Sequence, residues 1–129
     1  MARVLVVDEN RYLRMLYALE LAAEGHEVVL AANPDEALER LKVACPDIVV
    51  MDICRKTSDG GPDTAEVLRN THKLPVILNT AHDLSEGNWL ASQADACLVK
   101  SSDFSELKAK IRELLVRPSH LNEREVLAQ

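Results

Sequence analysis

The chain has 129 residues, a length typical of a single domain that buries about two-thirds of the surface exposed by its unfolded form. Its 21 acidic and 15 basic side chains give a formal net charge of -6, which argues against a general nucleic-acid or anionic-membrane surface. The apolar runs are far shorter than the roughly 20 residues that span a bilayer, and the first is too short for a signal-peptide core. We therefore expect a cytoplasmic domain that binds neither membranes nor DNA directly.

Short β-branched runs alternate with longer amphipathic patterns along the chain, which is typical of βαβ units around a parallel sheet. Strands are predicted at residues 3–7, 27–31, 47–51, 74–79 and 96–99. Helices are predicted at residues 11–24, from 34 to the break before 46, at 63–70, at 85–92 and from 102 or 103 to 116. The helix at 85–92 is expected to be short, because Gly87 lies inside it.

The first two helices carry clear end signals. Gly25 is placed to stop the first helix. The apolar face of that helix is predicted to consist of Leu13, Leu16, Tyr17 and Leu21. In the second helix, Asn33 is the predicted N-cap, Pro34 the first helical residue, and Glu36 a side chain able to reach back toward the cap.

The last helix is predicted to begin at Ser102 or Asp103, with Glu106 at capping-box spacing, and to end before Pro118. Its inward side chains are predicted to be Phe104, Leu107, Ile111, Leu114 and Leu115. The cysteines Cys45, Cys54 and Cys97 are odd in number and lack C-x-x-C spacing, so neither a disulfide framework nor a thiolate zinc site is expected. We expect three reduced, buried thiols.

Polar side chains able to do chemistry follow or end four of the predicted strands, namely Asp8, Asp52, Thr80 and Lys100. In an open α/β sheet, ligands bind outside the carboxyl ends of the strands, near the point where the strand order reverses. With the strand order 2-1-3-4-5, that crevice lies between the first and third strands. Asp8, Glu9 and Asp52 would then converge there.

Three neighbouring carboxylates repel one another, which raises their pKa values unless a cation neutralises them. Mg²⁺ suits such a site, because it takes one or two carboxylates, keeps bound waters and completes its shell with phosphate oxygens. A lysine and a hydroxyl on adjacent strand ends, Lys100 and Thr80, would bind the remaining oxygens of a phosphoryl group. Asp52, the middle carboxylate, is the candidate nucleophile.

With these residues the chain resembles the receiver domain of two-component response regulators, over roughly residues 3–116. The matching motifs are Val6-Val7-Asp8-Glu9, Asp47-Ile48-Val49-Val50-Met51-Asp52, Asp59-Gly60, Pro75-Val76-Ile77 with Thr80-Ala81, and Leu98-Val99-Lys100. The resemblance implies a flavodoxin-like α/β fold: a doubly wound, five-stranded parallel sheet with helices on both faces.

The resemblance also implies a function, in which Asp52 takes a phosphoryl group from a histidine kinase or phosphotransfer protein. Mg²⁺ would be held by Glu9, Asp52 and the backbone carbonyl of Cys54, with Asp8 assisting through the metal's water shell. Thr80 and Lys100 would contact the phosphoryl group. Such a domain assists its own phosphorylation and dephosphorylation without counting as a conventional enzyme. Phosphorylation would switch binding to an unknown downstream protein, and a homodimer is left open.

Several residues depart from the usual pattern of the family. Glu9 stands where aspartate is more common, Lys56 replaces a proline, and Ser101 follows Lys100 where a proline after a cis peptide is usual. Cys97 occupies the position of an aromatic ring that changes rotamer on activation, and a cysteine is too small for that movement. Either the signal leaves through the loop after Thr80 and the helix at 85–92, or the coupling is weak.

Two other functions are kept as alternatives. The departures are compatible with a pseudo-receiver, a constitutive protein-binding module without phosphoryl chemistry. A flavodoxin-like binder of a small ligand is disfavoured, because no Gly/Ser/Thr-rich phosphate loop follows the first strand. We assign residues 1–117 to the receiver domain and 118–129 to a C-terminal tail without an output domain, either a helical extension or a frayed end.

Overall fold

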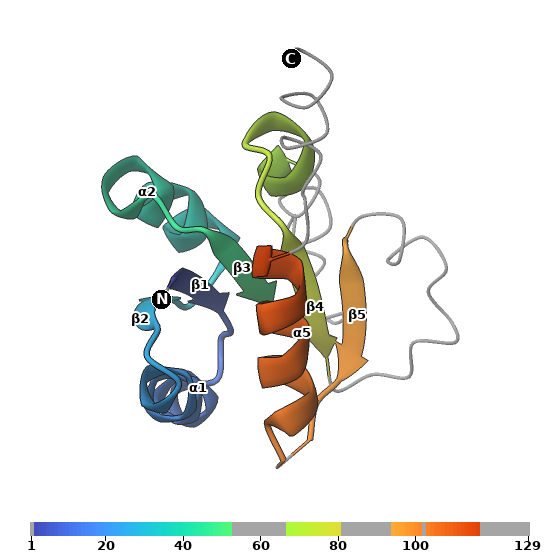
Figure 1. Ribbon diagram of the computed structural model, residues 1–129. Coiled ribbons are helices and arrows are strands. Elements are labelled where there is room, and N and C mark those ends of the chain that lie inside the picture. Colours follow the sequence, from blue (N-terminus) through green and yellow to red (C-terminus); the bar gives the residue numbers. More distant parts are fainter. Residues whose placement is uncertain (1, 53–66, 81–93, 102, 117–129) are drawn as a thin grey trace, which may run out of the picture.

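Five parallel strands form one sheet in the order β2-β1-β3-β4-β5 (Figure 1). The computed structural model describes residues 2–52, 67–80, 94–101 and 103–116. The strands are β1 (Arg3–Val7), β2 (Glu27–Ala31), β3 (Ile48–Met51), β4 (Val76–Thr80) and β5 (Ala96–Val99). The predicted doubly wound sheet and its strand order are confirmed.

The first, second and fifth strands have their predicted bounds, whereas β3 and β4 begin later. Asp47 precedes β3, and its carboxylate accepts the backbone N–H of Arg3, the first residue of β1, at 2.8 Å. Leu74 still belongs to the preceding connection, since its N–H donates to the carbonyl of Leu68 and Lys73 before it has a left-handed φ of 59°. Thr80 is the last residue of β4.

The described helices are α1 (Arg11–Ala23), α2 (Pro34–Ala44) and α5 (Ser105–Val116), together with a π-helical turn, η1 (Val67–Thr71). The turn η1 overlaps the end of the helix predicted at 63–70, and the helix predicted at 85–92 lies outside the described residues. Gly25 follows α1 with a φ of 91°, in the left-handed region where glycine carries no steric penalty. No helix in the described ranges is long and apolar enough to cross a membrane.

The start of α2 is capped from both directions, as predicted. The side chain of Asn33 accepts the N–H of Glu36 at 2.9 Å, and the Glu36 carboxylate accepts the N–H of Ala32 at 2.9 Å. The glutamate therefore reaches the residue before the cap. Pro34 begins the helix, where its missing N–H leaves no hydrogen bond unmade.

The start of α5 is later than predicted, at Ser105. The hydroxyl of Ser101 accepts the N–H of Asp103 at 3.1 Å, and the Asp103 carboxylate accepts the N–H and hydroxyl of Ser105 at 2.9 and 2.6 Å. These local bonds satisfy the backbone in a non-helical conformation and so delay the helix. The Lys100–Ser101 peptide is trans, since the described residues contain no cis bond.

The core has two layers, one on each face of the sheet (Figure 1). On one face α2 and η1 pack through Ala37 and Leu68. On the other, α1 and α5 bury Tyr17, Leu21, Leu107, Ile111 and Leu114, with Phe104 and Leu115 partly buried. The prediction that Leu16 belongs to the buried face of α1 was wrong. Leu16 is 45% exposed, because only part of the apolar stripe of α1 is buried.

The expectation of buried thiols was wrong for Cys45. This residue is exposed, because it caps the C-terminus of α2 in a left-handed conformation with a φ of 47°. Cys97 is half-buried on the α2 face of the sheet, where burial raises the pKa of its thiol. Cys54 lies outside the described residues.

Candidate functional site

The register of the central strands brings two carboxylates together at one edge of the sheet. Val7 of β1 pairs with Met51 of β3, and Asp8 and Asp52 are the next residue of each strand. The N–H of Asp52 donates to the carbonyl of Val7 at 2.8 Å, and the N–H of Asp8 donates to the carbonyl of Ala31 at 3.1 Å. Both aspartates are therefore fixed by the backbone ladder of the sheet.

Lys100, which follows the edge strand β5, bridges these two carboxylates. Its Nζ lies 2.7 Å from Oδ2 of Asp8 and 3.2 Å from Oδ2 of Asp52. The side chains are 16% exposed for Lys100, 1% for Asp8 and 14% for Asp52. In such a setting the attraction between opposite charges is much stronger than in bulk water. Of the three carboxylates predicted to converge, Asp8 and Asp52 meet at Lys100, whereas Glu9 is exposed.

The carboxylate of Asp8 is held from both sides. Its Oδ1 accepts the backbone N–H of Asn10 at 2.8 Å, while Oδ2 accepts from Lys100. Arg14, one turn into α1, donates to the backbone carbonyl of Asp8 at 2.8 Å. Asn10 is also the N-cap of α1, where its side chain accepts the N–H groups of Tyr12 and Leu13. The helix start and the acidic site therefore share one residue.

The environment of Asp52 makes its carboxylate more basic than usual. Burial is the main reason that its pKa is raised, and the negative charges of Asp8 and Glu9 act in the same direction. Lys100 opposes both effects through its charge and its hydrogen bond. The lysine therefore offsets the repulsion between the carboxylates, and it is burial that leaves the pKa of Asp52 raised.

The predicted metal ligands are only partly described. Asp8 and Asp52 offer carboxylate oxygens, the side chain of Glu9 is exposed, and Cys54 lies outside the described residues. Within the described ranges no three side chains of His, Cys, Asp or Glu are gathered to hold a metal ion. Two neighbouring carboxylates nevertheless fit Mg²⁺, which binds through one or two carboxylates and keeps several waters. The Mg²⁺ site remains a prediction.

Thr80 lies where the sequence places it, at the end of β4, the strand between Asp52 and Lys100. Its backbone pairs with Val99, the residue before Lys100. The position of its side chain is not among those described. The topology therefore supports the predicted place of Thr80 at this edge of the sheet.

Sequence reasoning missed a buried polar pair beside the site. Asn79, which directly precedes Thr80, donates from Nδ2 to the hydroxyl of Tyr17 at 2.6 Å. Both side chains are buried, at 6% and 2% exposure. The sequence feature that could have revealed this pair is the polar side chain of Asn79 directly after the apolar residues of β4. The sequence contains no indication that its partner is Tyr17 on α1.

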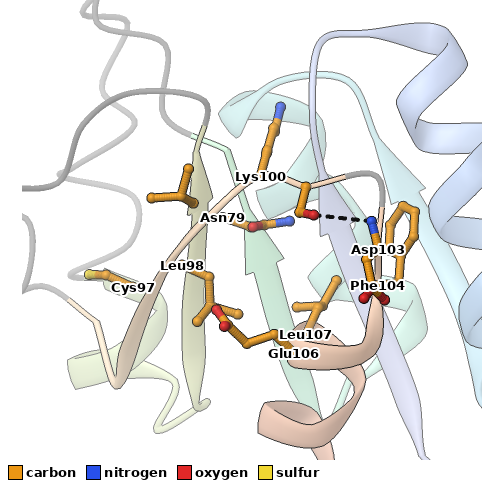
Figure 2. A pocket seen from close by; sticks show the side chains of 10 residues that line it. Asn79, Cys97, Leu98, Lys100, Asp103, Phe104, Glu106 and Leu107 are labelled. Carbon is orange, nitrogen blue, oxygen red and sulfur yellow. Dashed lines mark hydrogen bonds between the residues drawn. The ribbon is translucent and has the colours of Figure 1, made fainter.

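A cavity of about 530 Å³ lies between the end of β5 and the start of α5. Figure 2 shows Asn79 from β4 and Phe104 and Leu107 from the α5 region facing this space. Lys100 lines it as well, so the cavity and the acidic site share one residue. Asp8 and Asp52 do not line the cavity.

Comparison with known proteins identifies the family. The family model described as "Response regulator receiver domain" matches residues 4–112. The chain belongs to this family. It is the receiver domain of a two-component response regulator, as the motifs around Asp8, Asp52 and Lys100 predicted.

Curated relatives of this receiver domain are transcriptional regulatory proteins. CpxR of Escherichia coli K12 is 35% identical over 127 residues, which cover 97% of this chain and 53% of the relative. AfsQ1 of Streptomyces coelicolor is 33% identical over 119 residues, covering 91% of this chain and 52% of the relative. The chain thus spans about half the length of the curated relatives it matches.

Solved receiver structures share the fold. TrrA of Thermotoga maritima, solved in complex with Mg(2+)-BeF, is 36% identical with a TM-score of 0.81, covering 89% of this chain and all of that one (100%). The response regulator TrrA solved in complex with the histidine kinase ThkA is 35% identical with a TM-score of 0.78, covering 89% of this chain and 99% of that one.

Proposed function

We propose that this receiver domain accepts a phosphoryl group on Asp52 from a histidine kinase or phosphotransfer protein and thereby switches its protein interactions. The observation that carries the proposal is the bridge from Lys100 Nζ to Asp8 and Asp52 at the carboxyl edge of the sheet. The pseudo-receiver alternative, a constitutive binding module without phosphoryl chemistry, does not require two carboxylates joined by one lysine at this edge of the sheet.

In the proposed reaction, an oxygen of Asp52 attacks the phosphorus of a phosphohistidine. A new O–P bond forms while the P–N bond breaks, and its electron pair stays on the departing imidazole nitrogen. The raised pKa of Asp52 means that its ionised carboxylate is more basic than an exposed one. Lys100, already 3.2 Å from Asp52, is placed to pair with a transferred phosphoryl oxygen while Asp8 keeps its ammonium in position. Thr80 is the proposed second contact of the phosphoryl group.

Mg²⁺ is the proposed cofactor, with Asp8, Glu9, Asp52 and the backbone carbonyl of Cys54 as the proposed set that holds it. The carboxylates are hard oxygen donors of the kind that Mg²⁺ prefers. The similar receiver TrrA was solved with Mg(2+)-BeF, which supports this choice. When bound, the ion would supply positive charge to the phosphoryl oxygens during transfer.

The exposed apolar face of α1 is the proposed docking surface for the kinase. Tyr12, Met15, Leu16 and Leu19 are 74%, 54%, 45% and 68% exposed. The N-cap of this helix, Asn10, donates its backbone N–H to Asp8, so a partner bound to the helix would lie beside the site. The solved complex of the similar receiver TrrA with the kinase ThkA supports a histidine kinase as the occupant.

The phosphoacceptor is tested with acetyl phosphate and Mg²⁺, followed by intact mass. The parent is expected to gain one phosphoryl group, and Asp52→Asn none. Asp35→Asn, which removes an exposed carboxylate in the first turn of α2, is the matched control and should react like the parent. The proposal fails if the parent forms no adduct, if Asp52→Asn still forms one, or if a chelator leaves the yield unchanged.

The docking face is tested by transfer from a phosphorylated histidine kinase. Leu19→Asp is expected to slow this transfer while leaving labelling by acetyl phosphate unchanged. Val43→Asp is the control, because Val43 is 81% exposed on α2, which covers the opposite face of the sheet. Equal slowing by both variants, or by neither, would rule out α1 as the docking surface.

We further propose that the domain works in the cytoplasm and passes its state to a downstream protein. The curated relatives are named as transcriptional regulators, and the chain matches about half of each. The proposed output of the matched half, the receiver domain, is a contact with another protein. Direct DNA binding by this domain is not proposed, in keeping with its net charge of -6. We propose that the domain assists its own phosphorylation and hydrolysis, and that no separate substrate is turned over.

A further inference from the structure

The Asn79–Tyr17 hydrogen bond is unusual for its place in the core. Both residues are buried in the layer between the sheet and the helices α1 and α5, among side chains that are otherwise apolar. Replacing both members of such a bond by apolar groups of similar shape costs little stability, whereas a half-removed bond leaves a buried polar group unpaired. The bond is therefore better suited to fixing a position than to holding the fold together.

Asn79 connects this hydrogen bond to the acidic site through its neighbour in β4, Thr80. Asn79 is the residue before Thr80 in β4, so the two residues share a peptide bond, through which a shift of the Thr80 backbone can reach Asn79. The hydroxyl of Tyr17 lies near enough to the site that the charges of Asp8 and Asp52 add to the effect of burial in raising its pKa. A change at Asp52 thus has a short physical route to Tyr17.

Tyr17 in turn belongs to a row of contacts between α1 and α5. Its ring meets Phe104 edge-on, with the ring centroids 5.5 Å apart and the planes at 83°. Farther along the helices, Lys108 Nζ lies 2.7 Å from Glu20 Oε1, and Arg112 Nη1 lies 2.7 Å from Glu24 Oε1. From one of these contacts to the next, the position moves by three or four residues along α1 and by four residues from Phe104 along α5. The two helices therefore run parallel to each other and in register.

We propose that the Asn79–Tyr17 hydrogen bond transmits the state of Asp52 from β4 to the paired helices α1 and α5. This inference rests on the proposed function, since it needs Thr80 to respond to a group on Asp52. Tyr17 and Asn79 are positioning residues in this scheme, because they act through Thr80. The route runs on the face of the sheet opposite Cys97, whose small side chain packs on the α2 face.

The test uses beryllofluoride with Mg²⁺ as a phosphoryl mimic and reads two signals from the same sample. Fluorine NMR reports whether the mimic is bound, and backbone amide shifts of Lys108 and Arg112 report the response of α5. In the parent, binding should move both amides. Tyr17→Phe should bind the mimic within about twofold of the parent, yet lose about half or more of the α5 response, because its bond to Asn79 is gone.

Two further variants separate transmission from simple structural support. The double variant Tyr17→Phe/Asn79→Leu should recover most of the stability lost by either single variant, because no buried polar group remains unpaired, and should still lack the α5 response. Val43→Ala shortens an exposed side chain on α2 and should behave like the parent in both signals.

The outcomes distinguish this inference from the proposal about Asp52. If Tyr17→Phe and the double variant bind the mimic and keep the full α5 response, the hydrogen bond does not transmit the signal and the inference is wrong, while the phosphoacceptor proposal stands. If the parent shows no bound fluoride signal, the phosphoacceptor proposal fails and the inference fails with it.

Discussion

The two faces of the sheet are covered by different kinds of contact. Toward α2 and η1, the buried cluster consists of aliphatic side chains and one methionine, Met51. Toward α1 and α5, the layer also holds the Tyr17–Asn79 hydrogen bond, the Tyr17–Phe104 ring contact and ion pairs between the helices. Apolar burial is non-directional, whereas hydrogen bonds and ring contacts require particular positions. Within the described ranges, the α1 and α5 face therefore adds a buried hydrogen bond and a ring contact to its apolar packing, while η1 adds the ion pair of Arg69 with Asp95.

Truncating a core side chain on each face should have the largest effect on stability. Leu21→Ala removes a fully buried side chain on the α1 face, and Leu68→Ala does the same on the η1 face. Each is expected to lower the free energy of unfolding by about 2–5 kcal/mol, because a cavity adds to the lost burial. Urea denaturation measures both. A loss below about 1 kcal/mol at Leu68 would mean that η1 contributes little to the packing of its face.

Breaking the bridge between the strand ends should have the next largest effect. Lys100→Met leaves Asp8 buried with an unpaired charge, which is expected to cost about 1–3 kcal/mol at neutral pH. The difference from the parent should shrink in acid, because Asp52, the second partner of Lys100, has a raised pKa and is neutralised there. Denaturation at several pH values tests this, with Lys110→Met as a control, since Lys110 pairs only with Glu113 three residues along α5. A pH-independent loss would contradict the explanation by charge.

Neutralising the phosphoacceptor should have a smaller effect, and of the opposite sign. The pKa of Asp52 is raised in the fold above its ordinary value of 3.8, so ionisation lowers stability as the pH rises from about that value through the raised pKa. Asp52→Asn removes this loss and should be more stable than the parent at neutral pH. Below about pH 3.8, where Asp52 is protonated in both the folded and unfolded parent, the variant should gain no stability. Thermal denaturation across pH checks this, and a variant less stable than the parent at neutral pH would contradict it.

The ion pairs between the helices should contribute least. Glu20→Gln removes the partner of Lys108 from a pair in which the glutamate side chain is 41% exposed. The expected loss is the smallest of these effects and should vanish at high salt, because exposed ion pairs are screened by solvent ions. A double-mutant cycle with Lys108→Met measures the coupling. A coupling that persists at high salt would show that the ion pairs, besides the rings, hold α1 and α5 in register.

The meeting of the residues at the strand ends was predictable from the sequence, because it depends only on where each residue stands relative to its strand. Once the strand order is known, parallel strands must bring Asp8 and Asp52 to one edge, and Lys100 is long enough to reach them from β5. The start of α5 was not predictable, because the side chains of Ser101 and Asp103 suit both a helix cap and a turn. The bond from Tyr17 to Asn79 joins residues 62 positions apart, and no local pattern contains such information.

The bridge from Lys100 to Asp8 also has a consequence for how the domain is made. It joins residues 92 positions apart, from the first strand of the chain to the last. Such a contact forms only after the intervening chain has been synthesised and β5 has docked on β4. A ribosome-bound or truncated chain that lacks residue 100 would still hold both aspartates but not the lysine between them. The complete acidic site therefore cannot form before the edge strand β5 is in place.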